Sequence, residues 1–127
     1  MDDSRSFYEP QLSTDGTRLL SFGGSAAVTV WDVRRRKPLC VLQGLGEVHH
    51  AALSDDGKLA ATAGADGTLR IWQVAGCREM TRHAGTFHYV AFNAAADAVA
   101  ANDYGGLVRV IAVVGGRPIS EGRYSRI

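Results

Sequence analysis

The chain has 127 residues, enough for one globular unit, and its 14 basic and 13 acidic residues give a formal net charge of +1. This balance gives no electrostatic reason for a nucleic-acid or anionic-membrane partner, and we expect neither. No run approaches the roughly 18 uncharged apolar residues that a membrane-spanning helix needs. The start Met1-Asp2-Asp3 does not resemble a signal peptide, so we expect a cytoplasmic protein.

Short β-prone runs recur along the chain at a nearly constant interval. Segments 27–33 and 68–74 contain the two tryptophans, Trp31 and Trp72, which lie 41 residues apart. A third segment, 107–113, carries Ile111 at the corresponding place, 39 residues after Trp72. A unit that recurs at this interval indicates a repeat protein, whose function lies on its surfaces rather than in a single catalytic pocket.

Each repeat is predicted to contain four short antiparallel strands joined by tight turns. The pairs Asp15-Gly16 and Asp56-Gly57 favour turns because Gly and Asp tolerate the positive φ that tight turns need. First strands are predicted at 7–13, 48–54 and 87–93, and second strands at 19–23, 59–64 and 98–101. Third strands are the runs given above, and fourth strands are predicted at 39–42, 80–83 and 119–121. The first strands are apolar on both faces, as in sheets that stack face to face.

The most regular copy reads LSDDGKLAATAGADGTLRIW from Leu53 to Trp72, and it resembles the WD-repeat family of β-propellers. The resemblance extends over about residues 7–122. It implies an all-β fold of three four-stranded antiparallel blades, at about 7–43, 47–83 and 86–122. It also implies a non-enzymatic scaffold that needs no cofactor and binds a protein or peptide partner.

Three blades make only a partial propeller, because closed rings use about four to eight. The two end faces of such an arc remain open, and large exposed apolar faces favour association. We expect closure by oligomerisation, for example a dimer that gives six blades. The alternative is a fragment of a longer propeller protein, such as a bacterial signalling protein, whose missing blades complete the ring and which has no autonomous function.

Many WD blades hold a buried set of His, Ser or Thr, Asp and Trp, and no repeat here has all four. The resemblance assigns five residues to this structural role: Trp31, Trp72, Thr62, Asp66 and His83. Asp66 and His83, with Thr62 or Ser54, have the residue types of a hydrolase triad. Because no G-x-S-x-G motif is present and these positions belong to the structural set, we expect no catalytic residue.

Partner contacts are expected beside the first strands and in the turns between second and third strands, on the rim and channel mouth that the resemblance implies. The candidates are Glu47, His49, Ala65, Thr86, His88 and Tyr104. His49 and His88 occupy equivalent positions in neighbouring repeats, and His50 matches Tyr89. Such imidazoles can bind metal, sense pH or contact a partner. No matched carboxylate or cysteine accompanies them, so we expect no metal, and a small-ligand or metal-binding channel is the alternative.

Four adjacent cations, Arg34, Arg35, Arg36 and Lys37, form a candidate basic patch between the third and fourth strands of the first repeat. They can grip phosphate or an acidic partner. They can equally form a solvated turn that protects a strand edge from unwanted pairing.

The two cysteines, Cys40 and Cys77, occupy different positions in their repeats and form no C-x-x-C motif. No disulfide framework is evident from this arrangement, and we expect two reduced thiols.

Overall fold

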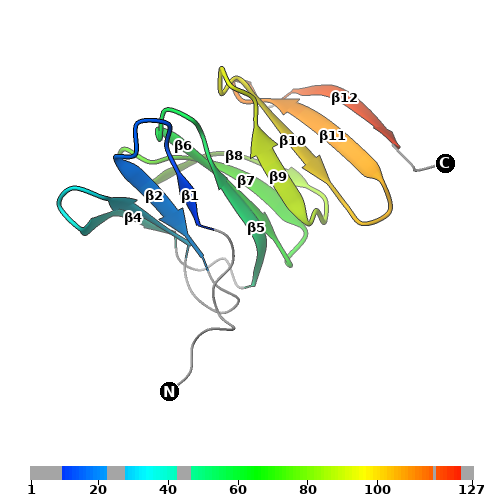
Figure 1. The fold of residues 1–127 in the computed structure, drawn as a ribbon. Helices are drawn as coiled ribbons and strands as arrows, with labels where there is room; N and C mark the ends of the chain where they lie inside the picture. The colour runs from blue at the N-terminus through cyan, green and yellow to red at the C-terminus, as the bar shows by residue number, and fades with distance from the viewer. Residues whose placement is uncertain (1–9, 23–27, 43–46, 116, 124–127) are drawn as a thin grey trace.

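The computed structural model describes residues 10–22, 28–42, 47–115 and 117–123, which form three four-stranded antiparallel sheets (Figure 1). Sheet 1 contains β1 (Gln11–Leu12), β2 (Arg18–Ser21), β3 (Val28–Asp32) and β4 (Lys37–Leu42). Sheet 2 contains β5 (Val48–Leu53), β6 (Leu59–Gly64), β7 (Thr68–Gln73) and β8 (Arg78–Ala84). Sheet 3 contains β9 (Tyr89–Phe92), β10 (Ala98–Asn102), β11 (Leu107–Ala112) and β12 (Pro118–Arg123). The strands of each sheet follow one another in sequence order, so the expected all-β fold of three such sheets is confirmed.

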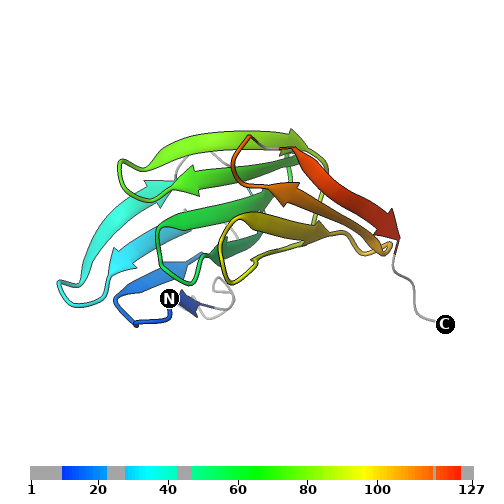
Figure 2. The same cartoon turned by 90° about the horizontal axis from the view of Figure 1, so that it is seen from above.

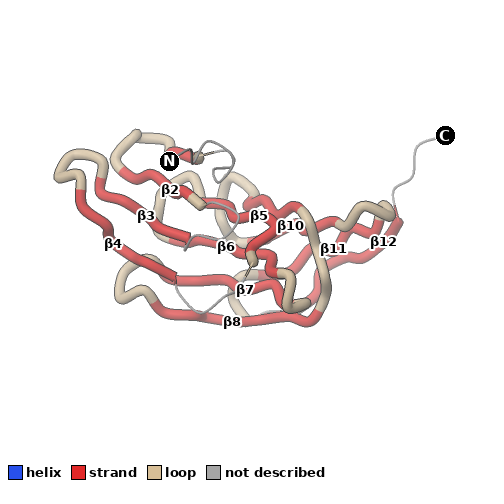
Figure 3. Tube along the Cα trace, turned by 90° about the horizontal axis from the view of Figure 1, so that it is seen from below, coloured by secondary structure: helices blue, strands red, loops and turns tan. Residues whose placement is uncertain are grey.

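The three sheets stand one behind another in an arc (Figure 2). The first strands lie next to one another, β1 beside β5 and β5 beside β9. The described residues consist of strands and loops (Figure 3), and no helix among them is long and apolar enough to cross a membrane. In sheets 2 and 3 the turns between second and third strands lie at one end of the strands, and in sheets 1 and 2 the turns between third and fourth strands lie at the opposite end.

The strand boundaries differ from the sequence-based ones mainly at the outer strands. β6 spans the predicted residues, whereas β4 and β8 begin two residues earlier, at Lys37 and Arg78. Strand pairing uses backbone N–H and C=O groups, so charged residues can extend an exposed strand. β1 is shorter than predicted, and residues 7–9 of that prediction lie outside the described residues, as do residue 23 of the second strand and residue 27 of the third.

Two apolar layers hold the sheets together. The first joins Leu20 and Val30 of sheet 1 to Leu53 and Trp72 of sheet 2. The second joins sheet 2 to sheet 3 through these buried side chains: Ala52, Ala61, Ile71, Val99 and Ile111. Within the described ranges, sheet 2 is therefore covered on both faces, whereas sheets 1 and 3 are each covered on one.

The two tryptophans make the same polar contact in different surroundings. The indole N–H of Trp72 donates to Thr62 Oγ1 at 3.1 Å, and that of Trp31 donates to Ser21 Oγ at 3.0 Å. Trp72 is buried between sheets 1 and 2, whereas Trp31 lies on the uncovered face of sheet 1 and is half-buried. These contacts support the structural role expected for Trp31, Trp72 and Thr62.

The turns between first and second strands are closed by side chains. Ser54 Oγ donates to Asp56 Oδ1 at 2.7 Å, and the same carboxylate oxygen accepts the backbone N–H of Lys58 at 2.9 Å. Sheet 1 repeats this arrangement with Ser13 and Asp15. The hydrogen bonds from the backbone and side chain of Thr17 and from Ser13 lower the pKa of Asp15 from 3.8 to about 2. These turns therefore depend on an ionised carboxylate.

Replacing Trp72 with Ala should lower the free energy of unfolding by about 3–5 kcal/mol, because it removes a buried aromatic side chain and leaves Thr62 unpaired. Trp31→Ala is the matched control and, in protein dilute enough to be monomeric, should cost clearly less, since Trp31 is only half-buried within one chain. Urea denaturation of both variants measures the difference. Equal losses would contradict the placement of the two tryptophans.

Acid should weaken the fold through the turn carboxylates. The folded-state pKa of Asp15 lies below its usual value, so its contribution to stability is complete above about pH 4 and is lost as the pH falls towards 2. Asp15→Asn should therefore show a smaller fall in unfolding temperature between pH 5 and pH 2 than the wild type. Asp55→Asn, which changes a carboxylate that accepts no hydrogen bond from the described residues, should follow the wild-type curve. Identical curves for all three proteins would contradict the role assigned to Asp15.

Candidate partner-binding rim

The rings of His49, His88 and Tyr104 form a continuous stack at one end of the strands. The turns between second and third strands of sheets 2 and 3 lie at the same end. His49 and His88 lie with ring centroids 4.5 Å apart and planes inclined by 15°. His88 in turn stacks on Tyr104, with centroids 3.9 Å apart and an angle of 17°. Tyr104 is 80% exposed and ends the stack at the surface. The structure therefore brings together three of the six rim candidates, which we call the ring stack.

Local backbone structure orients each ring. A register shift between Val48 and His50 in the β5–β6 pairing leaves His49 as the extra residue of a β-bulge. His49 Nδ1 lies 3.2 Å from the carbonyl oxygen of Phe87, which connects sheet 2 to sheet 3. The Tyr104 turn is closed by Asp103 Oδ1, which accepts the backbone N–H of Gly105 at 2.8 Å and of Leu107 at 2.9 Å. The ring stack thus rests on fixed backbone, which suits recognition without rearrangement.

His88 carries an unpaired polar atom at the centre of the ring stack. Its backbone N–H donates to Asn102 O at 2.9 Å, but its Nδ1 is buried and has no hydrogen-bond partner among the described residues. A buried polar atom without a partner costs about 1–3 kcal/mol. The stacking geometry is therefore kept at the expense of a hydrogen bond.

The other three rim candidates lie at the same end and are exposed. The backbone N–H of Ala65 donates to Glu47 O at 2.9 Å, which places these two residues together. Thr86 lies beside Gly67, in the turn that follows Ala65. Asp66 adds a carboxylate here, and its pKa is lowered chiefly by the hydrogen bond from the Thr68 hydroxyl. All six predicted residues therefore lie at the same end of the strands.

A second pair of rings, His50 and Tyr89, lies on the first strands of sheets 2 and 3. His50 and Tyr89 have centroids 5.0 Å apart, and the backbone N–H of Val90 donates to His50 Nδ1 at 3.2 Å. They line a hollow of about 540 Å³ that also includes Gln11 and Asn102. The two residues occupy equivalent positions in their repeats, and stacking of the sheets brings them together.

The amide of Gln11 is a connection that the sequence analysis missed. Its Nε2 donates to Ala51 O at 2.8 Å, and its Oε1 accepts the backbone N–H of Leu53 at 3.0 Å. One side chain thereby extends the hydrogen bonding of β5 into sheet 1. A single glutamine in a short polar segment carries no sequence signal for this role.

The remaining polar candidates do not assemble a catalytic or metal centre. Asp66 Oδ1 accepts both the backbone N–H and the hydroxyl of Thr68, and Asp66 Oδ2 pairs with Arg70 at 3.1 Å. No hydrogen bond in the described part of the chain joins Asp66 to His83, whose pKa is lowered by burial and by the nearby Arg109. Within the described ranges, no three His, Cys, Asp or Glu side chains are placed to hold a metal ion.

The basic patch lies at the end of the strands opposite the ring stack, and all four of its residues are exposed. Asp32 accepts the backbone N–H of Arg35 at 3.1 Å and forms an ion pair with its guanidinium at 3.0 Å. The backbone N–H of Arg36, at φ +57°, donates to Asp32 O at 2.8 Å. Asp32 thus closes this turn, which favours the solvated-turn interpretation, although Arg34, Arg36 and Lys37 keep their charges at the surface.

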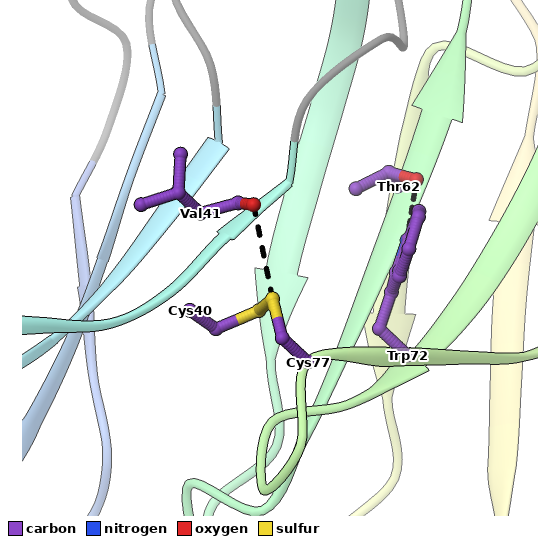
Figure 4. The surroundings of a disulfide bond; sticks show 5 residues. All are labelled: Cys40, Val41, Thr62, Trp72 and Cys77. Carbon is purple, nitrogen blue, oxygen red and sulfur yellow. Dashed lines mark hydrogen bonds between the residues drawn. A yellow bond between two sulfur atoms is a disulfide. The ribbon is translucent and has the colours of Figure 1, made fainter.

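Cys40 and Cys77 form a disulfide bond, so the expectation of two reduced thiols is wrong (Figure 4). Cys40 lies in β4 and Cys77 in the β7–β8 turn, with Cα atoms 5.1 Å apart. Their different positions within the repeat are what bring them together, because stacking places the outer strand of sheet 1 against the turn of sheet 2. Sequence spacing alone does not reveal this contact.

Removing the disulfide with the double substitution Cys40→Ala and Cys77→Ala should lower the free energy of unfolding by about 3–4 kcal/mol, because the bond closes a long loop in the unfolded chain. Denaturation with and without reductant measures this loss. Reductant should shift the wild-type curve to that of the double variant and leave the variant unchanged. A wild-type curve that does not respond to reductant would contradict the bond's contribution.

Comparison with known proteins gives one family match and several similar structures. Residues 36–73 match the family model "WD domain, G-beta repeat". The chain also matches the Cps50 (Swd1) β-propeller domain of Myceliophteria thermophila, with a TM-score of 0.74 and 14% identity over 94% of this chain and 44% of that one. U3-55K matches with a TM-score of 0.81 and 17% identity over 99% and 42% of the two chains. The WD40 repeats of RRP9 match with a TM-score of 0.79 and 18% identity over 98% and 40%.

These similarities concern the fold. They show that sheets 1 to 3 are arranged as successive propeller blades. The chain spans less than half the length of each of these three solved structures.

Proposed function

We propose that the chain is part of a WD-repeat β-propeller and acts as a non-enzymatic scaffold that binds a protein or peptide through its rim and channel mouth. The observation that carries this proposal is the ring stack, with Tyr104 80% exposed at its end. Aromatic side chains bury much area at little cost in conformational entropy, which makes them effective contact residues.

The surroundings of the ring stack favour a partner segment with a cationic or apolar side chain. Tyr104 presents a flat ring surface at the end of the ring stack, and Glu47 supplies an exposed carboxylate at the same end of the strands. Cations gain energy both over aromatic faces and beside carboxylates. The near-neutral net charge of the chain gives no comparable reason for nucleic acid or a membrane as the partner.

The second candidate function, a small-ligand or metal-binding channel, has less support. His49 and His88 are close, but their rings stack face to face, and His49 Nδ1 lies 3.2 Å from Phe87 O. Stacked imidazoles do not converge on one point as metal ligands must. The hollow beside His50 and Tyr89 lies along the strands that would line a channel, which makes it the place for a small ligand if one binds.

The proposal includes completion of the ring by further blades, because sheets 1 and 3 are each covered on one face only. Those blades come either from a second copy of the chain or from a longer protein of which this chain is a part. A cytoplasmic location is also proposed, and the Cys40–Cys77 disulfide counts against it, because cytosolic thiols are normally kept reduced.

Selection of peptides from a displayed random library against the folded wild-type chain tests the rim. Bound peptides should lose at least ~10-fold in affinity when Tyr104 is replaced with Ala, because a central aromatic contact is commonly worth more than 1 kcal/mol. Val114→Ala is the matched control, since Val114 is 81% exposed and follows β11 at the end of the strands opposite Tyr104. Peptides that bind both variants as they bind the wild type would contradict the proposed rim.

A further inference from the structure

The uncovered face of sheet 1 repeats a face that is buried inside the stack. Pairing across the first three strands of sheet 2 aligns a row that packs against sheet 1: Leu53, Ala60 and Trp72. The same pairing in sheet 1 aligns an equivalent row on the side away from sheet 2: Leu12, Leu19 and Trp31. Leu53 is 7% exposed, whereas Leu12 is 61% exposed. Sheet 1 thus presents an apolar face built for a preceding blade.

The uncovered face of sheet 3 repeats the opposite face of sheet 2. Sheet 2 covers sheet 3 with a row of buried small and branched residues: Ala52, Ala61 and Ile71. The equivalent row on the far side of sheet 3 has almost the same composition: Ala91, Ala100 and Val110. Ala52 is 3% exposed, whereas Ala91 belongs to the exposed residues. Sheet 3 therefore presents a face built for a following blade.

The two uncovered faces suit each other in size. Both interfaces within the chain join the following face of one sheet to the preceding face of the next. The face of sheet 1 is bulky, with Leu19 and Trp31, and that of sheet 3 is shallow, with Ala91 and Ala100. A bulky face against a shallow one gives the dense packing that interfaces share with protein interiors.

One hydrogen bond between neighbouring sheets has lost its acceptor on the face of sheet 3 and its donor on the face of sheet 1. Between sheets 2 and 3, the backbone N–H of Val90 donates to His50 Nδ1 at 3.2 Å. On the face of sheet 3, Tyr89 occupies the position of His50, so this ring-nitrogen acceptor is absent. In sheet 1, Pro10 occupies the position of Val90 and has no N–H to donate. The missing acceptor and the missing donor meet only when sheet 3 of one chain faces sheet 1 of another copy.

We infer that a second copy of this chain occupies the two uncovered faces head to tail, so that two copies close a ring of six blades. This inference rests on the proposed completion of the ring, and it names a second copy of the chain as the source of the missing blades. Sheet 3 of each copy packs against sheet 1 of the other, and a twofold axis runs along the channel. Closure in this way covers both apolar faces of every sheet.

Two variants, each blocked on one face, test this arrangement. Ala100→Arg obstructs the face of sheet 3, and Leu19→Arg obstructs the face of sheet 1. Native mass spectrometry of the wild-type chain over a dilution series should show a dimer of twice the 13.5 kDa chain mass. Each variant alone should dimerise at least ~100-fold more weakly, because it buries an unpaired charge. An equimolar mixture should recover a heterodimer, since one intact face of each kind remains.

Controls separate this inference from loss of folding and from failure of the rim. Val114→Arg, on an exposed turn away from both faces, should dimerise like the wild type. Circular dichroism should show that both blocked variants keep the wild-type β spectrum. Tyr104→Ala should remain dimeric, so a failed rim leaves this result unaffected.

Three outcomes overturn the inference. A monomeric wild type would assign the uncovered faces to blades from other sequence. A variant that dimerises alone as strongly as the wild type would mean that copies meet through like faces. A mixture that stays monomeric would contradict the pairing of sheet 1 with sheet 3.

Discussion

The structure depends on one constraint, which is that every sheet in it is apolar on both faces. Sheet 2 satisfies the constraint within the chain, because Trp72 and its neighbours pack on sheet 1 and Ile71 and its neighbours pack on sheet 3. Sheets 1 and 3 satisfy it on one side only. Burial of apolar surface is the main force that stabilises a fold, so the need for further sheets follows directly from the sequence of each strand.

The same stacking creates the candidate binding edge. His49 and His88 belong to different sheets and come within stacking distance because β5 and β9 lie side by side. Tyr104 joins them from the next turn. Gln11 and the Cys40–Cys77 disulfide fix sheet 1 to sheet 2, at the inner strands and at the perimeter. A rigid frame of this kind allows turn residues to differ while their positions remain fixed.

Repetition explains what could be predicted from the sequence. The period located all three sheets, and it showed that His49 and His88, and His50 and Tyr89, are equivalent positions, which the structure brings together in neighbouring sheets. Contacts between non-equivalent positions were not predictable in this way. The disulfide joins a strand residue to a turn residue, and Gln11 pairs through its side chain with a neighbouring backbone. The stacking of Tyr104 on His88 depends on the conformation of one turn, which the repeat pattern does not specify.

Amide hydrogen exchange, followed strand by strand at several protein concentrations, tests the central claim that each sheet needs a neighbour on both faces. Strand β7 of sheet 2 should remain the most protected at all concentrations, because both faces of its sheet are covered within the chain. Strands β3 and β11 should match β7 when the protein is concentrated and exchange faster on dilution. Equal protection of all three strands at concentrations where the chain is monomeric would contradict the claim, since it would mean that sheets 1 and 3 are stable with one face uncovered.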